Sequence, residues 1–174
     1  MRDHDALEKN PNVSKAELEA IHGQLFGWAL SRCGFDAATA EDLMQQAYVE
    51  LLSGRARFDN KSALKTFVFG VVQNLARSRF RGDNKHLRLI DKFTTEQDDS
   101  TEDNHDHHNW NRVWEAVVTL PQRQRDITEL VFIRDMTIEE ASAVMGVSLG
   151  TGRVHYDRAK KALAEKLAEL NPAE

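Results

Sequence analysis

The sequence predicts an all-α protein with two small helical domains, joined by a flexible acidic linker, and a helix-turn-helix in the C-terminal domain. Apolar residues recur at helical spacing in two blocks, residues 1–83 and 111–174, which we take as the two domains. Only nine glycines and three prolines interrupt the 174 residues. Residues 84–110 form the expected linker, because the run from 96 to 108 has no apolar residue to bury.

Three helices with apolar stripes are expected in the N-terminal domain. The first begins at a Ser-x-x-Glu capping box and stops at a glycine, and the second begins at an aspartate. A polar loop at residues 54–61 leads to a third helix, which a serine caps and a glycine ends. These boundary residues are Ser14 with Glu17, Gly34, Asp36, Ser62 and Gly82.

Four helices are expected in the C-terminal domain. The first is amphipathic and stops at a Leu-Pro pair, whose proline opens the second. A second capping box begins a short third helix, and a tight glycine turn leads to a serine that caps the last helix. The residues that mark these elements are Trp110 to Val118, Leu120-Pro121, Thr137 with Glu140, Gly146-Val147 and Ser148.

The last two helices have the spacing of a DNA-reading helix-turn-helix, in which the N-terminal turns of the second helix meet base edges in the major groove. Arginine pairs bidentately with guanine, serine and threonine contact bases or phosphates, and lysines further along reach phosphates. The spacing alone also fits a helical hairpin with solvated basic residues. The candidate DNA-binding side chains are Ser148, Thr151, Arg153, His155, Arg158 and Lys161.

Composition excludes several classes of protein. No apolar run is long enough to span or insert into a membrane, and residues 1–10 lack the apolar core of a signal peptide. The single cysteine, Cys33, has no internal partner, so we expect a cytoplasmic protein. The chain has no P-loop, no His-Glu-x-x-His and no paired cysteines, so no enzyme, cofactor or small-molecule substrate is expected.

The net charge of −5 argues against nucleic-acid binding only until its distribution is considered. Residues 84–111 hold three basic and seven acidic side chains, so the excess negative charge lies mainly in the linker. The linker residues His105, Asp106, His107 and His108 are capable metal ligands. Adjacent ligands in a flexible tract form only a weak, unselective site, so we predict no metal centre and interpret the tract as a solvated linker.

Five segments together resemble a known family. They are LPQRQR at 120–125, TIEE at 137–140, GVSLGT at 146–151, AEDLMQQ at 40–46 and SALKTFVFGVVQNLARSRFR at 62–81. The first three are similar to region four, and the last two to region two, of the extracytoplasmic-function (ECF) group of bacterial RNA polymerase sigma factors, within the sigma-70 family. Two independent matches in the expected order are more specific than either match alone.

The resemblance implies roles for particular residues. An exposed helix face would grip the clamp helices of the largest subunit of core RNA polymerase, through Glu41, Asp42, Gln45 and Gln46. The third helix and the loop before it would bind the −10 promoter element and capture a flipped base, through Arg57, Asn60, Lys61, Ser62, Asn74, Arg77 and Arg81. Thr151, Arg153 and Arg158 match positions that read the −35 element. Phe67 matches a family tryptophan, but core packing explains it equally well.

The function implied by the resemblance is transcription initiation. Such a factor binds core RNA polymerase, recognises the −10 and −35 elements of promoter DNA and promotes promoter melting, with an anti-sigma factor as its expected regulator. Two alternatives stay open: a stand-alone helix-turn-helix regulator, and a sigma-like decoy that titrates an anti-sigma factor. A regulator of the first kind usually needs a dimerisation helix, and none is evident.

The sequence departs from the family pattern inside the helix-turn-helix. Gly152 stands where valine is usual, and Ala141 and Ser142 stand where isoleucine and alanine are usual. These changes predict a thinner core. Val154 and Asp157 also differ, and Asp157 would repel phosphates unless a neighbouring cation neutralises it, so the −35 preference cannot be copied from relatives.

Overall fold

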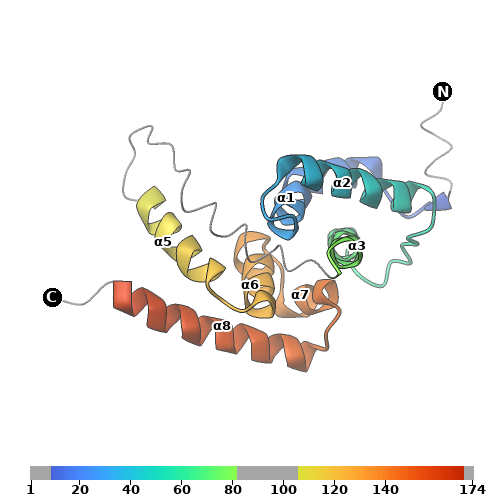
Figure 1. Ribbon diagram of the computed structural model, residues 1–174. Helices are drawn as coiled ribbons and strands as arrows, with labels where there is room; N and C mark the ends of the chain where they lie inside the picture. The colour runs from blue at the N-terminus through green and yellow to red at the C-terminus, as the bar shows by residue number, and fades with distance from the viewer. Residues whose placement is uncertain (1–8, 82–105, 171–174) are drawn as a thin grey trace. The chain divides into compact units, whose positions relative to one another are not determined.

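The computed structural model describes residues 9–81 and 106–170, and within these residues the chain forms helices and no strands (Figure 1). The all-α prediction is confirmed. The chain divides into two compact units between Asp91 and Lys92, and each unit has its own packed helices. Most of the expected linker, residues 84–105, lies outside the described residues, as does Gly82.

The first unit contains α1 (Lys15–Arg32), α2 (Ala37–Leu52) and α3 (Leu64–Arg79), and each helix packs against the other two (Figure 1). A side chain caps each of the first two helices, but only one of the two bonds of the predicted Ser14–Glu17 capping box forms in the described structure. The Ser14 hydroxyl accepts the N–H of Glu17 at 3.5 Å, and the Asp36 carboxylate accepts an N–H one turn into α2.

The centre of this unit is Trp28, which is fully buried. Its indole Nε1 donates to the carbonyl oxygen of Phe69 at 3.3 Å, and the two rings stack with centroids 6.2 Å apart. The Arg32 guanidinium lies 4.0 Å from the centroid of the Trp28 ring, so a cation covers one face of the indole. These contacts bind α1 to α3 and fix which face of α3 points inward.

The start and the buried face of α3 differ from the expectation. Ser62 does not cap the helix, because its hydroxyl donates to the Ala63 carbonyl oxygen at 3.3 Å and Ala63 takes the N-cap position with no side-chain bond. Phe69 is fully buried whereas Phe67 is only half-buried, because Trp28 packs against Phe69. The contact between Trp28 and Phe69 thus sets which side of α3 is buried.

The second unit contains α5 (Asp106–Val118), α6 (Gln122–Thr128), α7 (Ile138–Met145) and α8 (Leu149–Leu170), and α8 packs against the other three (Figure 1). α5 begins at Asp106, so the last five residues of the expected linker, 106–110, are helical. This helix packs against α8. Once packing has formed a helix, adding residues at its N-terminus costs little free energy, because the unfavourable nucleation step is already complete.

A π-helical turn, η3 (Glu129–Ile133), follows α6 directly. It ends where the N–H of Arg134 bonds to the carbonyl oxygen of Glu129, five residues back, at 3.1 Å. The Arg134 guanidinium also pairs with the Glu129 carboxylate at 2.9 Å, and Glu129 is almost fully buried. A buried ion pair therefore holds the wide turn closed, and this feature was not predicted from the sequence.

The helix-turn-helix is confirmed in detail. The Thr137 hydroxyl accepts the N–H of Glu140 at 3.1 Å, and the Glu140 carboxylate accepts the N–H of Thr137 at 2.8 Å, which completes the capping box of α7. Gly146 ends α7 with a left-handed backbone at φ 66°. Ser148 then accepts the N–H of Thr151 at 3.1 Å and begins α8.

Candidate nucleic-acid interface

The predicted −35 reader is the N-terminal half of α8. Its candidate side chains are exposed, except for His155, which is half-buried; the exposed ones are Ser148, Thr151, Arg153, Arg158 and Lys161. The Ser148 hydroxyl donates to the Thr151 hydroxyl at 2.9 Å, so the cap also orders the first polar group of the face. Thr151 and Arg158 are seven residues apart and share a helix face, as a reading surface requires.

Sequence reasoning missed one residue of this face. Val154 is an apolar side chain three residues after Thr151, yet it is 45% exposed. An exposed valine on a recognition helix suits contact with the methyl group of thymine. Its position within the motif was the only available signal, because an apolar residue in a helical stripe is normally assigned to the core.

Asp157 lies within this basic surface and is exposed. In the part of the chain that the structure describes, no ion pair joins Asp157 to Arg153 or Lys161, the two cations one turn away. Neither of these two cations therefore offsets the carboxylate beside the candidate phosphate contacts. Lys160, on the adjacent position, lies with its Nζ 5.4 Å from the centroid of the Tyr156 ring.

The predicted flipped-base residues occupy the loop between α2 and α3. Arg57, Asn60, Lys61 and Ser62 are all exposed there. Asn60 has a left-handed backbone at φ 60°, where the N–H of Lys61 bonds to the carboxylate of Asp59 at 3.2 Å. The Lys61 ammonium also pairs with Asp59 at 2.8 Å, and this pairing raises the pKa of Lys61. The Lys61 ammonium stays charged, but the Asp59 carboxylate beside it offsets the charge that it offers to a phosphate.

The α3 part of the predicted −10 surface is only partly as expected. Asn74 and Arg77 are exposed and three residues apart on one face of the helix. Arg81 is also exposed, but α3 ends at Arg79 and Phe80 leaves helical geometry with φ −103° and ψ 12°. The expected alignment of Arg81 with the other two along one helix is therefore wrong. Phe67, half-buried, packs on the Phe58 ring with centroids 5.2 Å apart, which supports the packing interpretation.

The predicted polymerase-binding face of α2 is exposed at each of its four positions, Glu41, Asp42, Gln45 and Gln46. Asp42 reaches Arg79 on α3, with 3.7 Å between the carboxylate and guanidinium atoms. Val49, one turn beyond Gln46, is 51% exposed and extends the face with apolar surface. Neither the contact of Asp42 with Arg79 nor the exposure of Val49 was predicted, because cross-helix contacts and exposure have no signature in residue spacing.

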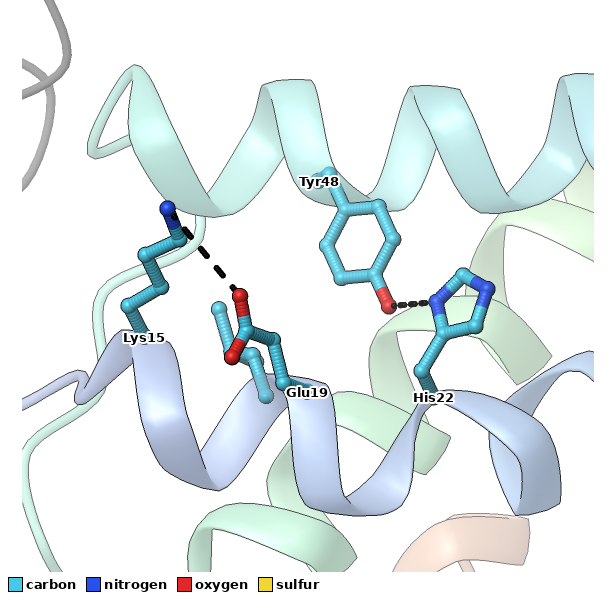
Figure 2. Close-up of a pocket in the computed structure, with 5 residues that line it drawn as sticks. Lys15, Glu19, His22 and Tyr48 are labelled. Carbon is cyan, nitrogen blue, oxygen red and sulfur yellow. Dashed lines mark hydrogen bonds and ion pairs between the residues drawn. The ribbon is translucent and has the colours of Figure 1, made fainter.

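On the same unit, α1 and α2 border a cavity of about 380 Å³, which Figure 2 shows in close-up. His22 Nδ1 and the Tyr48 hydroxyl lie 2.8 Å apart across it, and Lys15 pairs weakly with Glu19 at 4.0 Å (Figure 2). Burial raises the pKa of Tyr48, so its hydroxyl stays protonated at neutral pH. This arrangement links α1 to α2 on an otherwise solvated side.

Metal-ligating side chains and the single cysteine were also considered among the described residues. They contain no group of three or more His, Cys, Asp or Glu side chains that would hold a metal ion. The His/Asp tract of the linker lies outside the residues whose side chains are described. Cys33 is buried, and burial raises the pKa of its thiol to about 11, which disfavours the reactive thiolate. None of the helices described is long and apolar enough to cross a bilayer.

Comparison with known proteins identifies the two units. The family "Sigma-70 region 2" matches residues 18–86, and "Sigma-70, region 4" matches residues 110–163. The RNA polymerase sigma factor CarQ of Myxococcus xanthus is 26% identical over 88% of this chain and 89% of its own length. The ECF RNA polymerase sigma factor EcfG of Rhodopseudomonas palustris is 28% identical over 87% of this chain and 83% of its own. The chain belongs to the ECF group of the sigma-70 family.

Two solved structures share the fold of this sigma factor. One is the sigma factor RpoE of Bartonella quintana in complex with the anti-sigma factor NepR, with a TM-score of 0.64, 23% identity, and coverage of 88% of this chain and 95% of that one. The other is CnrH in complex with the cytosolic domain of CnrY, with a TM-score of 0.62, 21% identity, and coverage of 95% and 96%.

Proposed function

We propose that this ECF sigma factor binds core RNA polymerase through α2, reads the −10 element with α3 and the loop before it, and reads the −35 element with α8. The observation that carries the proposal is the separation of these surfaces. Each of the two units has its own core, and each leaves exposed the polar and cationic side chains that the family match assigns to a partner. We expect the factor to act in the cytoplasm and to perform no chemistry itself, since polymerase carries the active site.

The polymerase step rests on the α2 face. Glu41, Asp42, Gln45 and Gln46 present carboxylates and amides beside the exposed apolar side chain of Val49. A polar rim next to an apolar anchor is the usual composition of a protein interface. The ion pair between Asp42 and Arg79 is exposed and loosely spaced, so a cation of the polymerase clamp would displace it at little cost.

The proposed recognition of the −10 and −35 elements is supported by exposed cationic side chains and by the capped N-terminus of α8. Arg57 and Arg77 are exposed for phosphates of a single strand, and the neighbouring Asn60 and Ser62 offer donors and acceptors to an unstacked base. On α8, Thr151, Arg153 and Arg158 lie in the N-terminal turns, the part of a recognition helix that enters the major groove. Duplex reading and strand capture are thus assigned to different units.

Regulation by an anti-sigma factor is a further part of the proposal. The two solved structures named above are both complexes, of the sigma factor RpoE with the anti-sigma factor NepR and of CnrH with the cytosolic domain of CnrY. This chain exposes apolar side chains in each unit, Val49 in the first and Phe132 and Ile133 in the second. Such side chains are candidates for a partner that covers both units while polymerase is absent.

The decisive experiment is run-off transcription with sigma-free bacterial core polymerase and a promoter library from the source genome. We expect specific transcripts that are lost with Asp42→Ala through failure to bind core, and with Arg77→Ala despite normal core binding. Glu169→Ala is the matched control, since Glu169 is exposed near the end of α8, and it should transcribe normally.

Each failure has its own meaning in this experiment. Core binding without any transcript would favour a decoy that titrates an anti-sigma factor. Duplex DNA binding without core binding would overturn the proposal and favour a stand-alone regulator.

A further inference from the structure

The segment that precedes α1 lies against the loop between α2 and α3. Its key residue is Asn10, which is only 3% exposed. The Asn10 side-chain amide donates to the carbonyl oxygens of Leu51 and Ala56, the latter at 2.8 Å, and its oxygen accepts the N–H of Phe58 at 3.1 Å. One side chain thus joins the end of α2 to the middle of a loop more than 40 residues away in sequence.

Further contacts in the same place fix the loop. The Asn12 side-chain amide donates to the carbonyl oxygen of Phe58 at 3.4 Å, so both backbone groups of Phe58 are bonded to the N-terminal segment. Gly54 has φ 73°, and a Cβ at that position would lie 3.0 Å from the Cβ of Lys9. The Phe58 ring is itself buried. The close approach of Lys9 and the bonds of Asn10 therefore require one loop conformation.

We infer that Asn10 is a positioning residue for base capture at the −10 element, an inference that rests on the proposed function. It holds the backbone on both sides of Arg57 and two residues before Asn60, and both of these side chains are assigned to the flipped base. Asn10 is too buried to contact DNA itself. A loop already held in its bound shape does not lose further conformational entropy when it takes up a base.

The chemistry of the side chain explains why an asparagine is needed. Two carbonyl acceptors and one N–H donor face position 10, and only an amide offers two donors and an acceptor in one short group. Aspartate keeps the bond from Phe58 and loses both bonds to Leu51 and Ala56, whereas alanine leaves all three buried backbone groups unpaired.

The test uses full-length protein with core polymerase and forked promoter DNA whose single-stranded −10 bases are varied one at a time. We expect Asn10→Asp to reduce affinity for the preferred base by about tenfold, as for unpaired buried hydrogen-bonding groups. Affinity for DNA with an abasic site at the captured position should equal that of the wild type. Affinity for core polymerase should be unchanged, because the α2 face is on the other side of the helix from its buried residues.

A matched control separates positioning from stability. Leu25→Val weakens the core of the same unit at a fully buried site on α1, and it should keep full base discrimination at equal loss of thermal stability. Asn12→Ala, which loses one weaker bond to the same loop, should show a smaller effect in the same direction as Asn10→Asp.

Two outcomes would overturn the inference: unchanged base discrimination in Asn10→Asp, or an equal loss in Leu25→Val. Failure of the proposed function looks different, because the wild-type protein itself would then show no base preference on forked DNA with core polymerase.

Discussion

Ser142 fills the space that a side chain at position 152 would need. A Cβ built on Gly152 would lie 1.8 Å from the Ser142 Oγ and 3.0 Å from its Cβ. The Ser142 hydroxyl is held in place because it donates to the carbonyl oxygen of Ile138 at 2.6 Å. Relative to the family pattern, α7 has a serine in place of alanine at position 142, and α8 has a glycine in place of valine at position 152. The added hydroxyl occupies the space beside Gly152. The prediction of a thinner helix-turn-helix core was therefore wrong at this contact.

This relationship predicts strong coupling between the two positions. Gly152→Ala should destabilise the second unit by about 1–3 kcal/mol through overpacking, despite the better helix propensity of alanine. Ser142→Ala introduced together with Gly152→Ala should recover a large part of that loss, because the closest atom is then removed. Chemical denaturation of the two single variants and the double variant measures the coupling free energy.

Gly150→Ala is the control for helix propensity on the same helix. Gly150 is exposed, and the nearest atom to its Cβ would be the Ser148 Oγ at 3.9 Å. This variant should be neutral or stabilising by up to about 1 kcal/mol. Equal effects at positions 150 and 152, or additive effects of the two changes at 142 and 152, would contradict the steric account.

Asp157 is predicted to weaken promoter binding in the wild-type protein. It is exposed among the cations of α8 and has no ion pair with Arg153 or Lys161 in the described structure. Asp157→Asn should tighten binding to −35 duplex DNA by about threefold at low salt, with a smaller gain as salt rises. Anisotropy titrations over a salt series would measure it, with Glu169→Gln as the control of equal charge change far along α8. A gain of the same size in that control would mean that only net charge matters.

Some local features of this fold were predictable from sequence, whereas those that depend on one particular side-chain contact were not. The capping box of Thr137 and Glu140 and the left-handed Gly146 depend on neighbouring residues alone, and both form as expected. The π-turn depends on a buried ion pair between Glu129 and Arg134 that residue spacing cannot signal. The failure of Ser62 to cap α3 likewise follows from a competing bond to a carbonyl oxygen.

The candidate site divides in the same way. Motif matching placed Thr151 and Arg153 on the exposed start of α8, because the motif itself contains the turn that exposes them. It could not find Asn10, whose partners are residues of a loop more than 40 positions later. A polar residue in a segment before a helix gives no sign in the sequence that it will be buried, because its hydrogen-bond partners come from a distant part of the chain.

Cys33 is predicted to be inert in the folded protein. Burial raises the pKa of its thiol to about 11, with opposing effects from the charges of Arg79 and Arg32. At pH 8 a thiol reagent should therefore label Cys33 far more slowly in native protein than in denaturant. Labelling at the same rate in both states would show that the site opens freely.

The same shift has a consequence for stability at alkaline pH. A raised folded pKa means that the unfolded thiol, with its pKa of about 9.0, loses its proton first. Below that pH the thiol is protonated in both states and makes no pH-dependent contribution, whereas between about pH 9 and 11 the free energy of unfolding should fall. Cys33→Ala should lack this component of the decline when its stability is compared with the wild type across the same pH range.

Val154 is predicted to read a thymine methyl group in the −35 element. Its side chain is 45% exposed on the face of Thr151 and Arg158, so an apolar contact with a base would bury surface that the free protein leaves in water. Replacing each −35 thymine by deoxyuridine removes only the methyl group, and at one position this should cost the wild type about fourfold in affinity, as for a buried methylene. Val154→Ser should bind thymine and deoxyuridine equally at that position while it keeps the salt dependence of the wild type. If the wild type does not distinguish the two bases anywhere in the element, Val154 makes no such contact and lies outside the surface that DNA covers.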